Sequence, residues 1–335
     1  MMLRQVCTFS TMRGLHKMLA AVTFSKSLSP YGTAVEGRPP IDANITNIPI
    51  GNSANFASDN AQDEGSDSSS SEPGSSGSTS NDIGSTYIEE EVAKFRAMAD
   101  SWWDLHGDCK PLHSLNRLRV SMIREGLIQS HLAKPQYADG PQPLTGLKIL
   151  DVGCGGGILC EPLARLGAKV VGLDAAEENI SVAIMHADHD PRVQQNVKYV
   201  YGTIEDHAEI IDEKYDAVIA SEVLEHVDAI DLFINTCANI IKPGGSFFIT
   251  TINKTTFSWV GAIAIAEYAL RLLPRGTHDW NKFIPRQELL FMLEKSGLVT
   301  RMVHGMSYNA LVNKWFWMSN TSINYAVHAV KEKGR

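Results

Sequence analysis

The chain has 335 residues, of which 44% are hydrophobic, and a formal net charge of −8. This length allows one large domain with additional segments, or two domains. The charge is uneven, because residues 87–252 carry 14 basic and 25 acidic residues whereas residues 253–335 carry 11 and 5. The acidic balance argues against a nucleic-acid-binding protein, but the basic last third leaves room for one face that meets an anionic surface.

The five cysteines are scattered along the chain and odd in number: Cys7, Cys109, Cys154, Cys160 and Cys237. They show no metal-ligand spacing and no pattern of a disulfide framework. We therefore expect a reducing compartment.

Two segments precede the predicted domain. Residues 1–35 hold four basic residues and no Asp or Glu, with apolar residues at helical spacing. This composition is typical of a mitochondrial transit peptide, with a basic disordered tail as the alternative. Residues 36–86 are acidic and rich in Ser and Gly, so we expect a disordered linker.

Ordered structure is expected over residues 87–335. A capping box over residues 86–89 predicts a helix whose apolar stripe reaches Trp102, and a second helix is predicted at about 114–131. Short apolar strands then alternate with helices, which predicts a parallel sheet covered on both faces. The predicted strands are 148–152, 169–173, 197–201, 215–220, 246–252, 298–304 and 323–330, and the helices are about 158–166, 176–189 and 228–241.

A glycine-rich turn, Gly153-Cys154-Gly155-Gly156-Gly157, follows the first strand. Glycine lets the backbone approach a ligand closely, and the next helix offers free N–H groups. The dinucleotide fingerprint requires a glycine where this chain has Ile158. The shorter spacing, with Asp151 before it and Asp174 after the second strand, is typical of an S-adenosylmethionine site. The alternative is a phosphate-binding or purely structural turn.

Beyond residue 87 the chain closely resembles the ubiquinone-biosynthesis O-methyltransferases, which are class I S-adenosylmethionine-dependent methyltransferases. The motifs that carry this resemblance are Trp102-Trp103-Asp104-Leu105, Lys110-Pro111-Leu112-His113, the glycine turn with Asp151, Gly172-Leu173-Asp174, Glu222-Val223-Leu224-Glu225-His226-Val227 and Leu273-Pro274-Arg275-Gly276-Thr277-His278-Asp279-Trp280. The resemblance implies an α/β, Rossmann-like fold: a seven-stranded, mostly parallel sheet with helices on both faces and an N-terminal helical cover.

The resemblance also implies that Arg119, Gly153, Asp174 and Ser221 contact S-adenosylmethionine. An arginine can pair with the methionine carboxylate and an aspartate can hold ribose hydroxyls. For Ser221 we expect a backbone contact. Without the resemblance, Arg119 would read as a solvated arginine on a basic helix face.

A second group of candidate ligands is Glu222, Glu225 and His226. Carboxylates suit Mg²⁺, and the resemblance favours a metal site here. In the alternative the two glutamates merely face a helix dipole, and His226 acts alone as general base or packs.

Residues 257–273 place Trp259, Ile263, Ala266, Leu270 and Leu273 on one face, with basic residues on both sides. The segment is too short to span a bilayer, so we expect an interfacial helix that docks on an anionic membrane and admits a polyprenyl chain. The alternative is a lid packed on the sheet. Trp315, Phe316 and Trp317 would line the tail path or close the core.

The expected function is S-adenosylmethionine-dependent O-methylation of polyprenyl-dihydroxybenzoate and demethylubiquinol in ubiquinone biosynthesis, with Mg²⁺. The expected location is peripheral, on the matrix side of the mitochondrial inner membrane, beside other ubiquinone-biosynthesis enzymes. The alternatives are methylation of another small phenol and a non-catalytic scaffold that binds the cofactor.

Overall fold

The computed structural model describes residue 86 and residues 88–255 and 283–333, which belong to one compact unit. The predicted transit peptide (1–35), nearly all of the predicted linker (36–86) and the predicted interfacial helix (257–273) lie outside the described residues.

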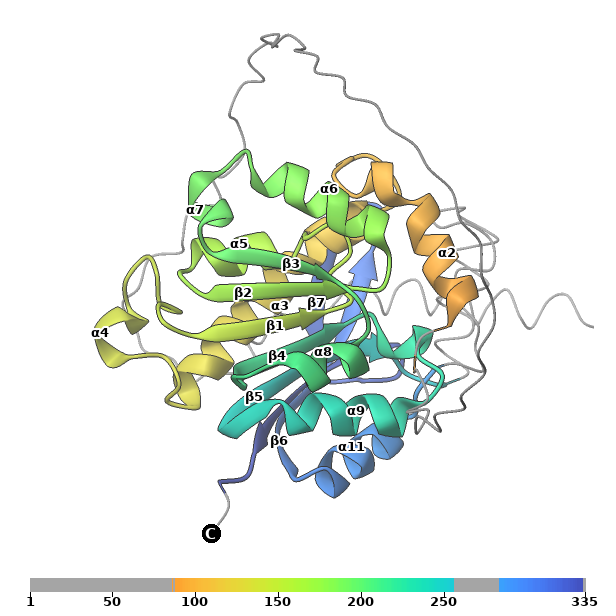
Figure 1. The fold of residues 1–335 in the computed structure, drawn as a ribbon. Helices are drawn as coiled ribbons and strands as arrows, with labels where there is room; N and C mark the ends of the chain where they lie inside the picture. Colours follow the sequence, from red (N-terminus) through yellow and green to blue (C-terminus); the bar gives the residue numbers. More distant parts are fainter. Residues whose placement is uncertain (1–85, 87, 256–282, 334–335) are drawn as a thin grey trace, which may run out of the picture. The chain divides into compact units, whose positions relative to one another are not determined.

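An eight-stranded sheet forms the centre of this unit, in the order β3-β2-β1-β4-β5-β8-β6-β7 (Figure 1). The first five strands in this order pair in parallel, whereas β8, β6 and β7 pair antiparallel. Their bounds are β1 (Lys148–Val152), β2 (Lys169–Asp174), β3 (Val197–Tyr201), β4 (Tyr215–Ser221), β5 (Ile241–Ile252), β6 (Leu298–Asn309), β7 (Lys314–Met318) and β8 (Asn324–Lys331). The predicted fold class is confirmed.

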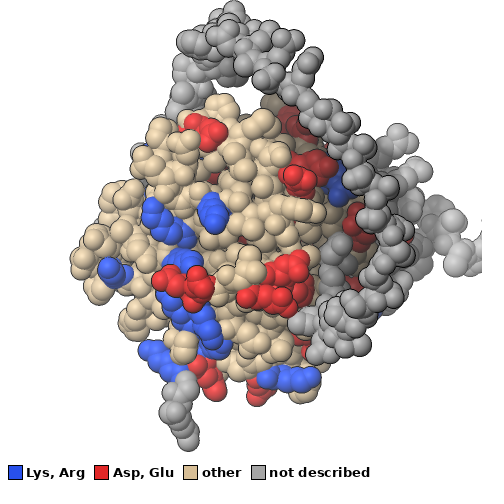
Figure 2. All heavy atoms as spheres, viewed as in Figure 1, with Lys and Arg blue, Asp and Glu red and all other residues tan. Residues whose placement is uncertain are grey.

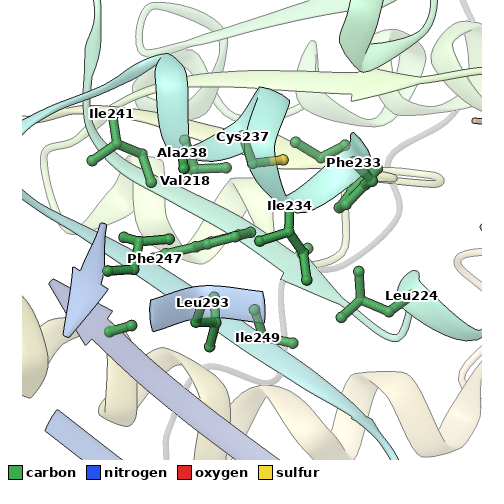
Figure 3. Packing of buried hydrophobic residues seen from close by; sticks show 14 of the residues in the cluster. Val218, Leu224, Phe233, Ile234, Cys237, Ala238, Ile241, Phe247, Ile249 and Leu293 are labelled. Atoms are coloured by element: carbon green, nitrogen blue, oxygen red, sulfur yellow. The ribbon is translucent and has the colours of Figure 1, made fainter. Parts of the chain in front are cut away.

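Helices cover both faces of the sheet because successive strand side chains point to opposite sides. Ile219 of β4 packs in a core with α3 (Lys110–Gln129), α5 (Cys160–Arg165) and α6 (Glu177–Ala187). Val218 packs in a second core with α8 (Ile204–Ile210), α9 (Ile230–Asn239) and α11 (Arg286–Lys295). In the second core, Phe247 of β5 lies near Ile234 of α9 and Leu293 of α11 (Figure 3). Full burial of a side chain such as Phe247 contributes about 2 kcal/mol.

The N-terminal cover consists of α2 (Glu89–Ala97), the 3₁₀ turn η1 (Ala99–Ser101) and α3. The predicted capping box is wrong: Ile88 caps α2 without a side-chain hydrogen bond, and the Thr86 hydroxyl donates to Glu205 at 2.7 Å instead. Helix α3 begins at Lys110, before its predicted start, because Pro111 fits the first helical turn. Three short elements complete the described chain: α4 (Pro135–Ala138), α7 (Pro191–Gln194) and η2 (Leu224–His226).

The strand count differs from the prediction at β7, which makes eight strands in place of seven. Trp315 and Trp317 pack against the core on the α3 side, whereas Phe316 between them is 37% exposed. This alternation is that of an edge strand with one covered face. Strand β5 also begins earlier than predicted, at Ile241, where its pairing with β4 is irregular.

Candidate cofactor-binding and catalytic site

The carboxyl ends of β2, β1 and β4 are neighbours in the sheet, and ligands of open α/β sheets bind at this edge. Gly153 follows β1, Asp174 ends β2 and Ser221 ends β4. Glu222 follows directly, and Arg119 reaches this edge from α3. The topology therefore brings the predicted cofactor residues to one edge.

The glycine turn is held in a shape that favours glycine. Gly153, Gly155 and Gly157 have φ values of 69°, 53° and 85°, in the left-handed region. The N–H of Gly153 donates to the carbonyl of Leu173 at 2.8 Å, which ties the turn to β2. A Cβ on Gly153 would lie 2.6 Å from Val223, so a side chain there would displace the segment after β4.

Asp174 is fixed by three hydrogen bonds. Its Oδ2 accepts from the N–H of Gly155 at 2.8 Å, and its Oδ1 accepts from the N–H of Ala176 at 2.9 Å and from Nδ2 of Asn179 at 3.1 Å. Burial raises the pKa of Asp174, and these hydrogen bonds oppose the rise by stabilising the carboxylate. The carboxylate is thus oriented before any ligand arrives.

Arg119 is only 5% exposed, so the solvated-arginine interpretation is wrong. Its Nη1 donates to the Ser221 hydroxyl at 3.0 Å and its Nε to Asn116 Oδ1 at 2.6 Å. Burial lowers the pKa of Arg119, and the carboxylates of Asp151 and Glu222 oppose that effect. A buried guanidinium therefore lies among carboxylates at the carboxyl edge.

Asp151, the acid before the glycine turn, is buried below it. Burial raises its pKa to about 6, an effect that Arg119 and the thiol of Cys160 oppose. The Cys160 Sγ donates to Asp151 Oδ2 at 3.2 Å. Asp151 therefore bonds inward, to α5, and links the strand to the helix that follows the turn.

Glu222 is a strained, half-buried residue. It is a non-glycine residue at φ 59°, and its N–H donates to the carbonyl of Thr250 at 2.9 Å. Burial and the charge of Glu225 raise its pKa to about 8. Oε1 of Glu222 is buried without a hydrogen-bond partner, whereas Glu225 accepts from the Thr251 hydroxyl at 2.8 Å. A cation between these two carboxylates would relieve their repulsion, so the pair fits a divalent ion.

His226 does not join this pair. Its Nδ1 lies 2.9 Å from Oε2 of Glu91 in α2, and its ring meets Phe95 edge-on at a centroid distance of 4.9 Å. Among the residues that the structure describes, no three His, Cys, Asp or Glu side chains gather in a way that could hold a metal ion. The three predicted ligands therefore do not converge in this structure: Glu222 and Glu225 influence each other electrostatically, and His226 is directed to the N-terminal cover.

Sequence reasoning missed the partners of these residues. Asn179 donates a hydrogen bond to Asp174, and Glu91 contacts the ring nitrogen of His226. The hydroxyls of Thr250 and Ser221 share a hydrogen bond of 2.7 Å. The contacts of Glu91 with His226 and of Thr250 with Ser221 join segments far apart in the chain, so no local pattern marks them. Asn179 is only five residues from Asp174, but nothing in the sequence distinguishes it from other polar residues at the start of that helix. Trp102 stood in a recognisable motif, but only the structure shows that it lies on the glycine turn.

The family described as "Methyltransferase domain" matches residues 150–249. The chain is 46% identical over 250 residues to the mitochondrial ubiquinone biosynthesis O-methyltransferase of Rattus norvegicus, covering 75% of this chain and 71% of that protein. It is 40% identical over 243 residues to the ubiquinone biosynthesis O-methyltransferase of Pelagibacter ubique, covering 72% and 98%. The crystal structure of magnesium protoporphyrin IX methyltransferase from Synechocystis with bound SAH shares the fold, with a TM-score of 0.52 at 19% identity over 73% of this chain and 99% of that one.

Proposed function

Because this chain belongs to the ubiquinone biosynthesis O-methyltransferase family, we propose that it transfers the methyl group of S-adenosylmethionine to a hydroxyl of polyprenyl-dihydroxybenzoate and demethylubiquinol. The observation that carries this proposal is the meeting of the glycine turn, Asp174, Arg119 and Ser221 at the carboxyl edge of one sheet. The alternatives are another small phenolic substrate and a non-catalytic scaffold.

Each cofactor residue has a chemical role that its surroundings support. Asp174 accepts three protein hydrogen bonds, and a carboxylate has about four acceptor positions, so about one position remains for a ribose hydroxyl. Arg119 uses part of its donor set on protein atoms and offers its remaining N–H groups to the methionine carboxylate. The positive φ of Gly153 brings its backbone to the ligand, and Ser221 lies beside Arg119.

The reaction is a displacement at carbon in which the phenolate oxygen attacks the methyl group and the sulfonium leaves as a neutral thioether. Holding the two reactants in line at near-attack distance supplies much of the rate. The chain's part in this step is to hold the sulfonium end of the cofactor at the carboxyl edge of β1 and β4.

Mg²⁺ is the further part of the proposal. Glu222 and Glu225 would hold the ion, with support from the unpartnered Oε1 of Glu222. A bound Mg²⁺ lowers the pKa of an oxygen ligand such as a phenol. His226 would bind the ion only after its imidazole ring breaks the contact with Glu91.

Location is proposed from the sequence and the relatives. The rat relative is named as mitochondrial, and residues 1–35 would act as the transit peptide, with residues 36–86 as a linker. A fluorescent reporter fused to residues 1–35 should enter mitochondria; a reporter that stays in the cytosol would contradict this.

Residues 257–273 would dock the enzyme on the matrix side of the inner membrane, near other enzymes of the pathway. No helix of the described residues is long and apolar enough to cross a bilayer.

The test uses purified protein, S-adenosylmethionine with a labelled methyl group and a short-tailed catechol. Labelled methoxy product is expected, and a protein that binds the cofactor without transferring the label would be a scaffold. Asp174→Ala is expected to weaken cofactor binding by about 1.5–3 kcal/mol, the range for hydrogen bonds to a charged group. Asp212→Ala, at an exposed acid outside the site, should bind as the wild type does. Unchanged affinity in folded Asp174→Ala, measured by calorimetry, would refute the ribose assignment.

A further inference from the structure

Trp102, which follows η1 in the N-terminal cover, lies directly on the glycine turn. It is 6% exposed. A Cβ on Gly156 would come within 2.5 Å of Trp102 Cβ, and a Cβ on Gly155 would enter the indole ring. These two glycines are therefore required by a residue of the N-terminal cover, whereas Gly153 faces Val223.

The polar atom of the same indole has a specific partner. Nε1 of Trp102 donates to Oδ1 of Asn179 at 2.8 Å, and Nδ2 of Asn179 donates to Oδ1 of Asp174 at 3.1 Å. Asn179 lies on α6 and is 1% exposed. A buried amide has one accepting end and one donating end. Because the indole N–H engages the accepting end, the donating end must face Asp174; a flipped amide would place oxygen against oxygen at Asp174 and N–H against N–H at Trp102.

We propose that Trp102 is a positioning residue of the cofactor site, which acts through Asn179 to fix the carboxylate of Asp174 for the ribose. The inference rests on the proposed ribose role of Asp174. It makes the segment between η1 and α3 part of the cofactor site, although that segment precedes the sheet in the chain. Trp102 thus shapes the site twice: its ring covers Gly155 and Gly156, and its N–H sets the direction of Asn179.

The test measures how well the protein distinguishes S-adenosylhomocysteine from an analogue whose ribose lacks both hydroxyls. Wild-type protein should prefer the natural ribose. Trp102→Phe keeps an aromatic ring on the glycine turn but removes the N–H, and it should reduce the ratio of the two dissociation constants by about threefold to tenfold, the value of one hydrogen bond. Asn179→Ala should reduce the ratio similarly, and the double variant should show no further reduction, because both changes break one chain of contacts.

The matched control is Trp103→Phe. It also removes an indole N–H, which donates to the carbonyl of Gly156 at 2.9 Å, but it leaves the contact between Trp102 and Asn179. In this variant the ratio of the two dissociation constants should stay at the wild-type value, even where both S-adenosylhomocysteine and the analogue bind more weakly. If folded Trp102→Phe and Asn179→Ala keep the wild-type ratio, the positioning role is overturned. If wild-type protein itself shows no preference, the ribose role of Asp174 fails, and the inference fails with it. Should Trp102→Phe not fold, the ratio of Asn179→Ala decides.

Discussion

Glu222 is the residue with the least favourable surroundings in the described site. It combines a left-handed backbone conformation with a half-buried carboxylate that is destabilised by the charge of Glu225 and has one buried, unpartnered oxygen. Strained non-glycine conformations cost about 1–3 kcal/mol each and cluster at binding sites. The fold tolerates this residue because Thr250 fixes its N–H and Thr251 fixes Glu225. A cation bound there, as we propose, would offset the repulsion between the two carboxylates.

The metal prediction follows from this pair. Activity should disappear with a chelator and return with Mg²⁺, and Glu225→Ala should abolish the return because one of the two ligands is lost. Glu213→Ala is the control, since the Glu213 side chain is 79% exposed and lies at the other edge of the sheet, beside Lys148. Full methyl transfer by chelated wild-type enzyme would exclude the metal.

Strand β8 contributes a buried histidine to the middle of the sheet. His328 pairs with Phe248 of β5, stacks on its ring at 4.4 Å and shares a hydrogen bond with the Ser246 hydroxyl at 3.0 Å. It is 1% exposed. Burial lowers its pKa to about 4, and the charge of Arg301 adds to the effect. The sheet therefore holds His328 in its neutral form.

This histidine makes stability depend on pH. In the unfolded chain it takes up a proton near pH 6.5, whereas the folded pKa is about 4. Between these values the unfolded state binds more protons, so the free energy of unfolding falls as the pH falls from 6.5 towards 4. His328→Gln should lose less stability between pH 7 and pH 5 than the wild type does, in urea unfolding at both pH values. His189→Gln, at an exposed histidine, should keep the wild-type slope; the same slope in His328→Gln would contradict the prediction.

Elements bounded by local signals were predictable, whereas those set by distant contacts were not. Strands β1 and β3 match their predicted bounds, because each apolar run ends at a glycine turn. The start of α2 was misjudged because the partner of Thr86 is Glu205, far along the chain. Strand β7 was missed because the aromatic run around Phe316 has no alternation of residue type that marks its covered face.

The same division applies to the site. Asp174 was predictable because it ends a strand that follows a glycine turn. The contacts of Asn179 with Trp102 and of Glu91 with His226 were not, since they join the N-terminal cover to the sheet domain. The position of His226 outside the carboxylate pair is a consequence of that cover.

Charge is distributed unevenly along the sequence, although both signs mix on the described surface. On the left of the face shown in Figure 2, Lys and Arg side chains lie beside Asp and Glu side chains. The net basic part of the sequence is residues 253–335, with 11 basic and 5 acidic residues. This part contains residues 257–273, which we propose as the membrane-docking segment. Basic residues near an anionic bilayer contribute about 1 kcal/mol each.

The membrane prediction concerns Trp259 and Leu270. Changing both to Glu should lower binding to anionic liposomes and cut turnover of a long-tailed substrate, because apolar contact with the bilayer is lost. Turnover of a short, water-soluble catechol should survive, since neither residue belongs to the cofactor site. If the folded double variant loses turnover of both the long-tailed substrate and the short catechol, the segment is a lid. If its binding to liposomes is unchanged, the docking surface lies elsewhere.

The strand order has a consequence for how the protein is made. Strand β8 is the last strand of the chain, yet it lies between β5 and β6 and pairs with both. During synthesis β5 leaves the ribosome long before β8 does. Ser246 therefore has no partner on this side of β5 until Val330 has been made. Until then β5 and β6 have open edges, and unpaired edges invite association with other chains. A nascent or truncated chain that ends before Asn324 therefore lacks the strand that covers both of these edges.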